Sequence, residues 1–434
     1  MSNKNRTLTW MVIAMLLGYL PWYNFSAVSS YILAEFNLKT EDLGVILSSF
    51  QAGYVIMVLF TGWLADKVGR QKVVAWATLC TGVFSTLFAF MANSFSSILV
   101  LRLLIGLSAG AIYAPGMALL INWFPPNERG KAIGAYTGAI SIAYAGGYFI
   151  AAPLAASLNW RIGILATSIP AFIAAAGIFL FVRERPALNQ EQCTRFQEQL
   201  VDVQENDLGR QGPRLTLDST TKFPSLKKRR WGPVLAVLGY MGHQWELYAF
   251  WGWIGPFLMA SAYAVGYSKT DAALVGSQLA AMIILLGGLS VWLIGMGADK
   301  WGKERTIIIA ALGSLIAELF FGFSYGHTLS IVTMIGMWIG FWAVADSGIY
   351  KIILTDMVSG EKAATALGIQ SAIGYSMTII SPYLFGKILG LTNKGITEPI
   401  YANQWGLPFL MLGAGAIVAP LSIFLLRRLA IASR

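Results

Sequence analysis

The side chains of this sequence that could exchange protons stand inside long apolar segments. His243 and Glu246 belong to the run GYMGHQWELYAFWGWIGPF and, three residues apart, share one face of a helix. Asp346 lies in a second run, WIGFWAVADSGIYKIILTD. Because a carboxyl group in apolar surroundings favours its neutral form, Glu246 and Asp346 are predicted to carry protons. A structural hydrogen bond is the alternative for Glu246, and simple packing is the alternative for His243.

Two cations also lie inside apolar segments. Arg102 begins a pattern with a glycine at every fourth position, and Tyr113 falls on the same helical stripe. A charged side chain in such a segment usually faces a cavity or a partner, although Arg102 could instead extend to the membrane surface. Lys351 follows Asp346 on a different helical face, so the sequence leaves open whether Asp346 pairs with Arg102 or Lys351 pairs with Glu246. Two fixed cations would suit a small anion.

Aromatic and amide side chains at the centres of other apolar segments complete the predicted binding site. The first segment contains YLPWYNFS, and the second contains Gln51. Any one aromatic side chain packs more often than it binds, so the set is a hypothesis. The predicted substrate-binding residues are Trp22, Tyr23, Asn24, Gln51, Arg102, Tyr113, His243, Tyr248 and Lys351. Weaker candidates are Tyr54, Gln370 and Tyr375, and Glu318 is a further intramembrane acid without an assigned role.

The composition is that of a chain that crosses a membrane many times. Of its 434 residues, 56% are hydrophobic and 12% are charged, and the mean hydropathy is +0.62. Soluble domains contain about 25% charged residues. Two cysteines and two histidines weigh against a disulfide scaffold or a zinc enzyme, and there is no phosphate-binding loop, HExxH run or GxSxG elbow. We therefore predict a protein that is not an enzyme and has no cofactor or metal site.

Apolar segments of about 20 residues, long enough to cross a bilayer as helices, recur along the chain. Twelve are predicted, near residues 8–33, 43–65, 73–92, 97–122, 132–156, 162–182, 232–262, 273–297, 306–325, 329–356, 364–390 and 405–428. Pro256 and two nearby glycines predict a bend or break in the seventh. The chain divides into an N-terminal six-helix bundle (1–182), a polar cytoplasmic loop (183–231) and a C-terminal six-helix bundle (232–434).

Lys and Arg are distributed unequally over the predicted loops. With both termini in the cytoplasm, the inside segments hold 24 of the 31 basic residues and the outside loops hold four. This asymmetry follows the positive-inside rule and predicts cytoplasmic termini in a bacterial inner membrane. The net charge of +10 then reflects topology and contact with anionic lipid, not binding to nucleic acid.

An eleven-residue pattern occurs twice, between the second and third segments of each half. GWLADKVGRQK at 62–72 and GMGADKWGKER at 295–305 keep Gly, Ala, Asp, Lys and Gly at matching positions. The glycines permit a tight turn, the bases hold the loop at the cytoplasmic face, and the acid could form a latch between conformations. A topology signal alone is the alternative. The predicted conformational-gating residues are Gly62, Asp66, Gly69, Arg70, Asp299, Gly302 and Lys303.

The first of these loops resembles the signature of the major facilitator superfamily. The resemblance covers the whole chain, although the second loop is degenerate, with Gly297 in place of Leu64. It implies an all-α membrane protein whose 12 transmembrane helices form two pseudo-symmetric six-helix bundles. It also implies that Asp66 stabilises the outward-open state with Asp299 as its counterpart, and that Arg102 serves proton coupling or an anionic substrate. Members of the family mostly act as monomers.

These observations predict a secondary active transporter that works by alternating access, with proton-coupled uptake of a small organic or inorganic anion. The alternative is a proton-coupled antiporter that exports drugs or organic cations. The fifth segment has Gly138 and the pair Gly146-Gly147 but no proline beside the first glycine, which departs from the pattern of export branches. A membrane sensor without transport would need an output domain, and the central loop does not resemble one. The expected partners are the substrate, protons and the lipid bilayer.

Overall fold

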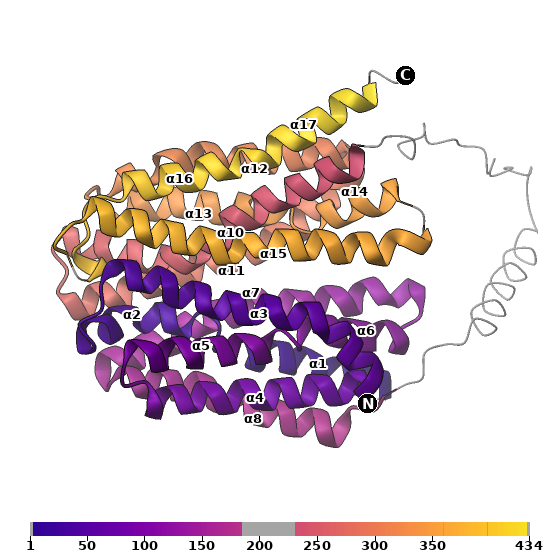
Figure 1. The fold of residues 1–434 in the computed structure, drawn as a ribbon, viewed down its shortest axis with the longest axis horizontal. Coiled ribbons are helices and arrows are strands. Elements are labelled where there is room, and N and C mark those ends of the chain that lie inside the picture. Colours follow the sequence, from indigo (N-terminus) through magenta and orange to yellow (C-terminus); the bar gives the residue numbers. More distant parts are fainter. Residues whose placement is uncertain (1–2, 185–230, 359, 397, 432–434) are drawn as a thin grey trace, which may run out of the picture.

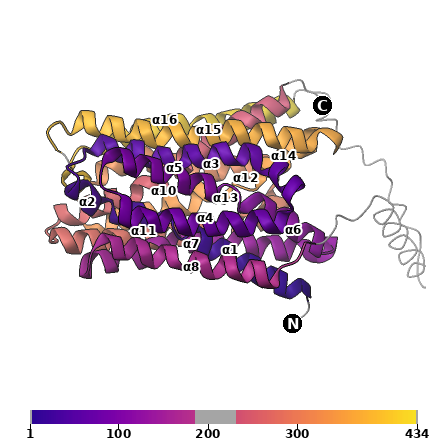
Figure 2. The same cartoon turned by 60° about the horizontal axis from the view of Figure 1, so that its bottom comes forward.

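The described residues of this computed structural model, 3–184, 231–358, 360–396 and 398–431, are built from helices that run along one long axis (Figures 1 and 2). In Figure 1 the N-terminal half (indigo to magenta) and the C-terminal half (pink to yellow) form two bundles that lie side by side. Both termini lie at one end of the molecule, which we call the terminus end; the opposite one is the far end. The predicted central loop, 183–231, lies almost wholly outside the described residues.

The helices occupy twelve membrane spans. The N-terminal bundle contains α1 (Asn3–Tyr19), α2 (Asn24–Glu35), α3 (Thr40–Val68), α4 (Arg70–Met91), α5 (Phe95–Ala109), α6 (Tyr113–Trp123), α7 (Pro126–Ser157) and α8 (Trp160–Phe181). The C-terminal bundle contains α10 (Gly232–Ala264), α11 (Lys269–Trp301), α12 (Lys303–Phe321), η2 (Gly322–Ser324), α13 (Leu329–Ala345), α14 (Ile349–Met357), α15 (Gly360–Thr392), η3 (Pro399–Tyr401), α16 (Gly406–Ala416) and α17 (Val418–Ile431).

Ten helical stretches among the described residues are long and apolar enough to cross a membrane. The other two spans are α10 and α15, each of 33 residues. Helix α10 is more polar because it carries His243, Gln244 and Glu246 near its middle. All three of these side chains are buried within the protein, so the helix does not expose them to lipid.

The first, fourth and tenth spans are each interrupted near their middle. The first breaks between α1 and α2, where Pro21 has no N–H to continue the hydrogen-bond ladder. The fourth breaks at residues 110–112 and the tenth at 346–348, which are equivalent places in the two halves. Helix α10 instead runs unbroken through Pro256, so of the bend or break predicted for the seventh span, the break is absent. The interruptions leave polar main-chain groups that other residues must satisfy.

The two duplicated loops have the same local structure. Gly69 joins α3 to α4 with φ +99°, and Gly302 joins α11 to α12 with φ +88°. A side chain disfavours this left-handed backbone, which explains glycine at both positions. Arg70 hydrogen-bonds a main-chain carbonyl of α6 at 3.4 Å, and Lys303 pairs with Asp356 of α14 at 2.6 Å. Each loop therefore contacts the second part of a broken span in its own half.

The two bundles are in close contact at the far end, where α3 packs against α15. A Cβ added to Gly44 would lie 2.8 Å from the carbonyl oxygen of Pro382, so only glycine permits this approach. Nearby, the Ser48 hydroxyl donates to the carbonyl of Ile379 at 2.7 Å. These contacts close the far end of the space between the bundles.

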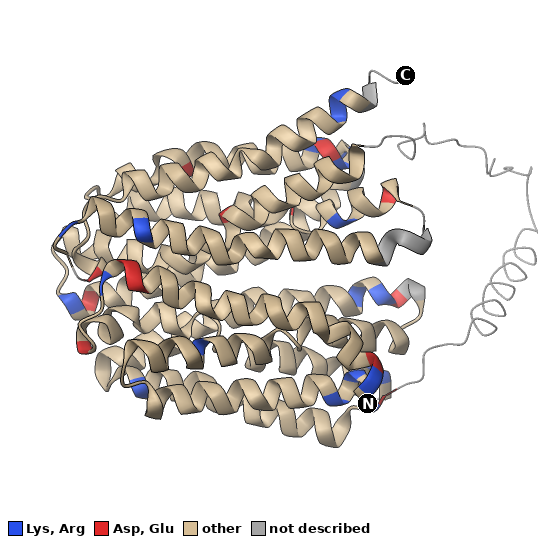
Figure 3. Cartoon of the chain, in the orientation of Figure 1, with Lys and Arg blue, Asp and Glu red and all other residues tan. Residues whose placement is uncertain are grey.

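Charged residues are concentrated at the two ends of the molecule. Figure 3 shows many Lys and Arg at the terminus end with several acids among them, acids and bases mixed at the far end, and few charges along the helices between. This pattern agrees with helices that cross a hydrocarbon layer, where ionised side chains are costly. The few charged residues in the middle are therefore candidates for function.

Candidate functional site

A cavity of about 730 Å³ lies between the two bundles. Its wall combines residues of α1, α3, α6 and α7 with residues of α10, α11, α14, α15 and the break in the tenth span. Gly130, Lys131 and Gly134 belong to the wall and are exposed near the start of α7, so the cavity opens at the terminus end. Its volume is in the range of sites for small molecules, about 300–1,000 Å³.

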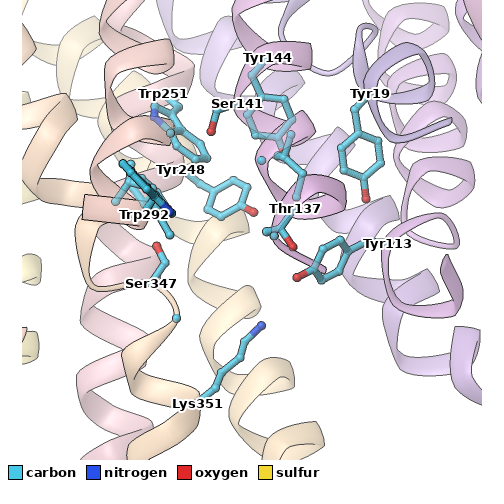
Figure 4. Close-up of a pocket in the computed structure, with 18 of the residues that line it drawn as sticks. Tyr19, Tyr113, Thr137, Ser141, Tyr144, Tyr248, Trp251, Trp292, Ser347 and Lys351 are labelled. Atoms are coloured by element: carbon cyan, nitrogen blue, oxygen red, sulfur yellow. The ribbon is translucent and has the colours of Figure 1, made fainter. Parts of the chain in front are cut away.

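The wall of the cavity is mainly aromatic, with hydroxyl and amide groups between the rings. The aromatic lining residues are Tyr19, Tyr54, Tyr113, Tyr144, Tyr240, Tyr248, Trp251, Trp292 and Tyr375. The other polar uncharged lining residues are Thr137, Ser141, Gln244 and Ser347. In Figure 4 the labelled side chains among these residues come from both halves and converge on one space. Such a wall can orient a ligand that carries several hydroxyl groups.

Lys351 places a positive charge deep in this cavity. Its side chain extends from the C-terminal half toward Tyr113 and Thr137 of the N-terminal half (Figure 4). In the described part of the chain no ion pair involves Lys351. Lys351 also lies in the first turn of α14, where the helix dipole is positive. The arrangement can therefore neutralise a ligand's negative charge.

Arg102 lies outside the wall of the cavity and stabilises the break in the first span. Its two terminal nitrogens donate to the carbonyls of Pro21 at 3.3 Å and Trp22 at 3.2 Å. The guanidinium also lies over the rings of Phe25 and Phe50, at 5.0 and 4.4 Å from their centroids. The side chain is 2% exposed. Arg102 thus hydrogen-bonds carbonyls that the interrupted helix leaves free.

Five of the predicted binding residues surround a small void beside the main cavity. The void has a volume of about 10 Å³, room for one water molecule at most. Trp22, Tyr23, Gln51 and Arg102 line it, and Tyr248 lines both this void and the main cavity. The predicted residue Asn24 lies elsewhere and donates to Thr167 at 2.8 Å. Of the predicted set, the main cavity is lined by Tyr113, Tyr248 and Lys351, and also by the weaker candidates Tyr54 and Tyr375.

A buried polar chain leads from the cavity wall into the C-terminal bundle. Ser347 lines the cavity, and its hydroxyl lies 2.9 Å from Nε2 of His243. On the other side of the ring, Nδ1 of His243 lies 3.0 Å from Oδ1 of Asp346. Asp346 therefore faces His243, and neither pairing that the sequence left open occurs among the described ion pairs. The break in the tenth span brings this chain to the wall.

Glu246 and Glu318 lie deeper in the same bundle. They are 2% and 0% exposed, on α10 and α12 respectively. One oxygen of Glu246 and both oxygens of Glu318 have no hydrogen-bond partner in the described part of the chain. An unpartnered buried carboxyl is costly if ionised, so both groups need an explanation.

The predicted gating residues lie at the terminus end, apart from the cavity. Asp66 lies 3.9 Å from Arg70 of the same half, and its side chain is 76% exposed. Gly62 of α3 has open space around it. The side chain of Asp299 lies outside the described residues. In this conformation the side chains of Asp66 and Arg70 contact residues of their own bundle.

Sequence reasoning did not identify the part of the wall contributed by α7. Thr137, Ser141 and Tyr144 are spaced by four and three residues and so lie on one face of the helix. That spacing is visible in the sequence, but the sequence argument for this segment used only its glycines, which were compared with the pattern of export branches. The roles of Tyr19, Gln244 and Trp251 depend on how the two bundles meet, and no single segment shows it.

Comparisons with known proteins agree with the fold. The model of the Major Facilitator Superfamily matches residues 11–382. A hexuronate transporter of Bacillus subtilis is 22% identical over 97% of this chain and 94% of that protein. A protein of Cupriavidus necator named as a probable sulfoacetate transporter is 24% identical over 96% of this chain and 93% of its own length. A bacterial homologue of the human lysosomal transporter Spinster, solved in an inward-facing, occupied conformation, superposes with a TM-score of 0.72 at 15% identity, covering 98% of this chain and 97% of the other.

Proposed function

We propose that this chain, which belongs to the Major Facilitator Superfamily, carries a small organic anion across the membrane by alternating access. The chain is an integral membrane transporter and not an enzyme. Two bundles that meet at the far end and enclose a cavity at the terminus end fit one of the states that such a mechanism requires.

The observation that carries this proposal is that Lys351 lies in the cavity and forms no ion pair in the described part of the chain. A fixed cation among aromatic side chains attracts an anion and repels an organic cation, so it favours anion transport over the export of cationic drugs. The hydroxyl groups around it suit an acid that itself carries hydroxyl groups. Two similar proteins bear the names of organic-anion transporters, for hexuronate and sulfoacetate. We therefore propose sugar acids as the first class of substrate to test.

The proposed direction is uptake into the cytoplasm of a bacterium together with protons. The concentration of Lys and Arg at the terminus end (Figure 3) supports cytoplasmic termini in an inner membrane. The cavity would then face the cytoplasm in this structure. Buried acids in the C-terminal bundle support proton coupling, because a transporter can pick up and release a proton only at a titratable group.

Uptake of radiolabelled D-glucuronate into liposomes that contain the purified protein tests the proposal. D-galactonate, D-glucarate, sulfoacetate and a lipophilic cation serve as competitors. We expect the acids to compete, the cation not to compete, and Lys351→Met to abolish uptake. Lys387→Met is the matched control, because Lys387 is an exposed lysine of α15 outside the cavity wall. Competition by the cation, or equal uptake by both variants, would refute an anion site at Lys351.

A further inference from the structure

The imidazole of His243 bridges two consecutive residues of the break in the tenth span. Its Nε2 atom lies 2.9 Å from the Ser347 hydroxyl, and its Nδ1 atom lies 3.0 Å from Oδ1 of Asp346. His243 and Asp346 are each 2% exposed, whereas Ser347 belongs to the cavity wall. A single hydroxyl group therefore separates a buried titratable pair from the cavity.

The internal repeat shows that the fold can make such a break without a titratable side chain. The equivalent break in the fourth span, residues 110–112, has the sequence Gly-Ala-Ile. In the tenth span residues 346–348 are Asp-Ser-Gly. The carboxyl group of Asp346 is therefore not needed to interrupt the span, and it is placed where burial makes an ionised group costly.

His243 is the group that can neutralise Asp346. Among the described residues no Lys or Arg forms an ion pair with Asp346, and Oδ1 has no hydrogen-bond donor besides the imidazole. Other titratable side chains on the helices around the ring are Tyr240 and Glu246 of α10, Glu318 of α12, Tyr350 and Lys351 of α14, and Tyr375 of α15. Lys351 is the one cation among these, and its side chain extends into the cavity (Figure 4).

One proton changes both the charge of the pair and the hydrogen bond that Ser347 offers to the cavity. A neutral imidazole beside an ionised carboxylate carries its proton on Nδ1, so its Nε2 accepts from the Ser347 hydroxyl. The pair of His243 and Asp346 then has a net negative charge. A doubly protonated ring makes the pair neutral, and Nε2 donates to the Ser347 oxygen instead. The hydrogen of Ser347 can then point into the cavity.

Both changes favour an anion in the cavity. Ser347 and Lys351 lie on the same wall, which the C-terminal half contributes (Figure 4). Loss of the negative charge behind this wall removes a repulsion from an anion at Lys351, and a hydroxyl hydrogen that faces the cavity can donate to a carboxylate. By linkage, an anion that binds more tightly to the protonated protein also favours its protonation.

We propose that the pair of His243 and Asp346 holds the transported proton and that Ser347 couples this proton to the anion. The proposal rests on the proposed function and names the site of its coupling ion. Ser347 passes its own proton to Nε2 of His243 and takes a proton from cavity water. Release of the proton reverses these steps. No bond other than O–H and N–H bonds forms or breaks.

Calorimetric titration of the purified protein with D-glucuronate, in buffers of different ionisation enthalpy, counts the protons taken up with the anion. We expect the unmodified protein to take up a proton, and both His243→Gln and Asp346→Asn to bind the anion without proton uptake. His327→Gln is the matched control, because the chain has two histidines and His327 is exposed in the turn between η2 and α13. It should take up the same number of protons as the unmodified protein.

The role of Ser347 is tested by the pH dependence of anion affinity. Ser347→Ala keeps the titratable pair but removes the hydroxyl that links it to the cavity, so the dissociation constant of D-glucuronate should depend less on pH. Ser347→Thr keeps the hydroxyl and should retain the pH dependence of the unmodified protein. The same pH dependence in Ser347→Ala as in the unmodified protein would refute coupling through Ser347.

The outcomes separate this inference from the proposed function. If the unmodified protein takes up a proton with the anion and His243→Gln does so equally, the pair alone fails. If the unmodified protein binds D-glucuronate without proton uptake, the proposed coupling fails together with the pair, and the anion site stands. If the unmodified protein binds none of the acids, the proposed function fails. Loss of anion binding in both His243→Gln and Asp346→Asn, in proteins that stay folded, would show a structural role and also refute the pair.

Discussion

Arg102 and Lys351 are both cations inside the membrane spans, but their surroundings assign them different roles. The guanidinium of Arg102 is committed to two main-chain carbonyls and two aromatic rings. The ammonium of Lys351 reaches a cavity and has no ion-pair partner in the described part of the chain. We therefore propose that Lys351 binds the charged group of the substrate and that Arg102 stabilises the break in the first span.

Replacement of Arg102 should destabilise the protein. Arg102→Met leaves two buried carbonyls without donors, and each unsatisfied group costs about 1–3 kcal/mol. Arg161→Met is the control, because Arg161 forms a partly exposed 2.7 Å ion pair with Glu35 of the kind usually worth at most about 1 kcal/mol. Thermal unfolding in detergent should give a clearly lower midpoint for Arg102→Met than for Arg161→Met. Equal midpoints would contradict a structural role for Arg102.

The sequence identifies some residues of the cavity wall and cannot identify their partners. Lys351, Tyr113 and Tyr248 are recognisable because polar and aromatic groups are unusual at the centre of an apolar span, and the structure places all three in the cavity wall. Contacts across helices depend on helix rotation and depth, which no single span encodes. For this reason the sequence left the partner of Asp346 open and gave Glu318 no role.

Broken spans position the polar residues of this protein. The break at 346–348 sets Ser347 in the cavity wall and starts α14 so that Lys351 enters the cavity. The break after Tyr19 is foreseeable from Pro21, which cannot continue a helix. Pro256 gives the same signal in the sequence, yet α10 continues through it. A proline inside a helix leaves one main-chain carbonyl without its usual hydrogen bond, and neighbouring groups in a packed bundle can satisfy that carbonyl. Those neighbours cannot be read from the segment itself.

The close packing of α3 on α15 should control which end of the cavity is open. Gly44→Ala adds a Cβ that would lie 2.8 Å from the carbonyl oxygen of Pro382, so it should oppose closure of the far end. Gly368→Ala is the control, because a Cβ at that position of α15 meets open space.

Thiol labelling measures this effect. A cysteine at Thr137, in a protein with Cys80 and Cys193 replaced by serine, reports access to the cavity from the terminus end. We expect Gly44→Ala to slow labelling by a membrane-impermeant reagent and Gly368→Ala to leave the rate unchanged. The same rate in both variants would show that the contact does not favour this state.

Over the whole molecule, two related bundles have kept their loops and diverged in their interiors. The duplicated loops, their positive-φ glycines and the breaks in the fourth and tenth spans agree between the halves. Among the described residues the buried charged side chains differ, with an arginine in one bundle and three acids in the other. The twelve spans and the repeat are legible in the sequence because apolar length and the loop pattern are local features. The division of roles between the bundles requires the structure.

Asp66 should affect the balance between states more than the fold. In this structure its side chain is exposed, and its contact with Arg70 of the same bundle is long, at 3.9 Å. A stronger contact would therefore have to form in another conformation. Asp66→Asn should therefore slow transport while membrane insertion and protein level stay unchanged. Initial rates of D-glucuronate uptake at matched protein amounts check this. Equal rates would exclude a gating role for the aspartate.

The most direct test of the account measures proton and anion movement together in liposomes that contain a pH-sensitive dye. The account predicts that addition of D-glucuronate acidifies the lumen, that Lys387→Met does the same, and that Lys351→Met does not. Acidification that persists in Lys351→Met, or proton exit on addition of a lipophilic cation, would contradict proton-coupled transport of an anion bound at Lys351.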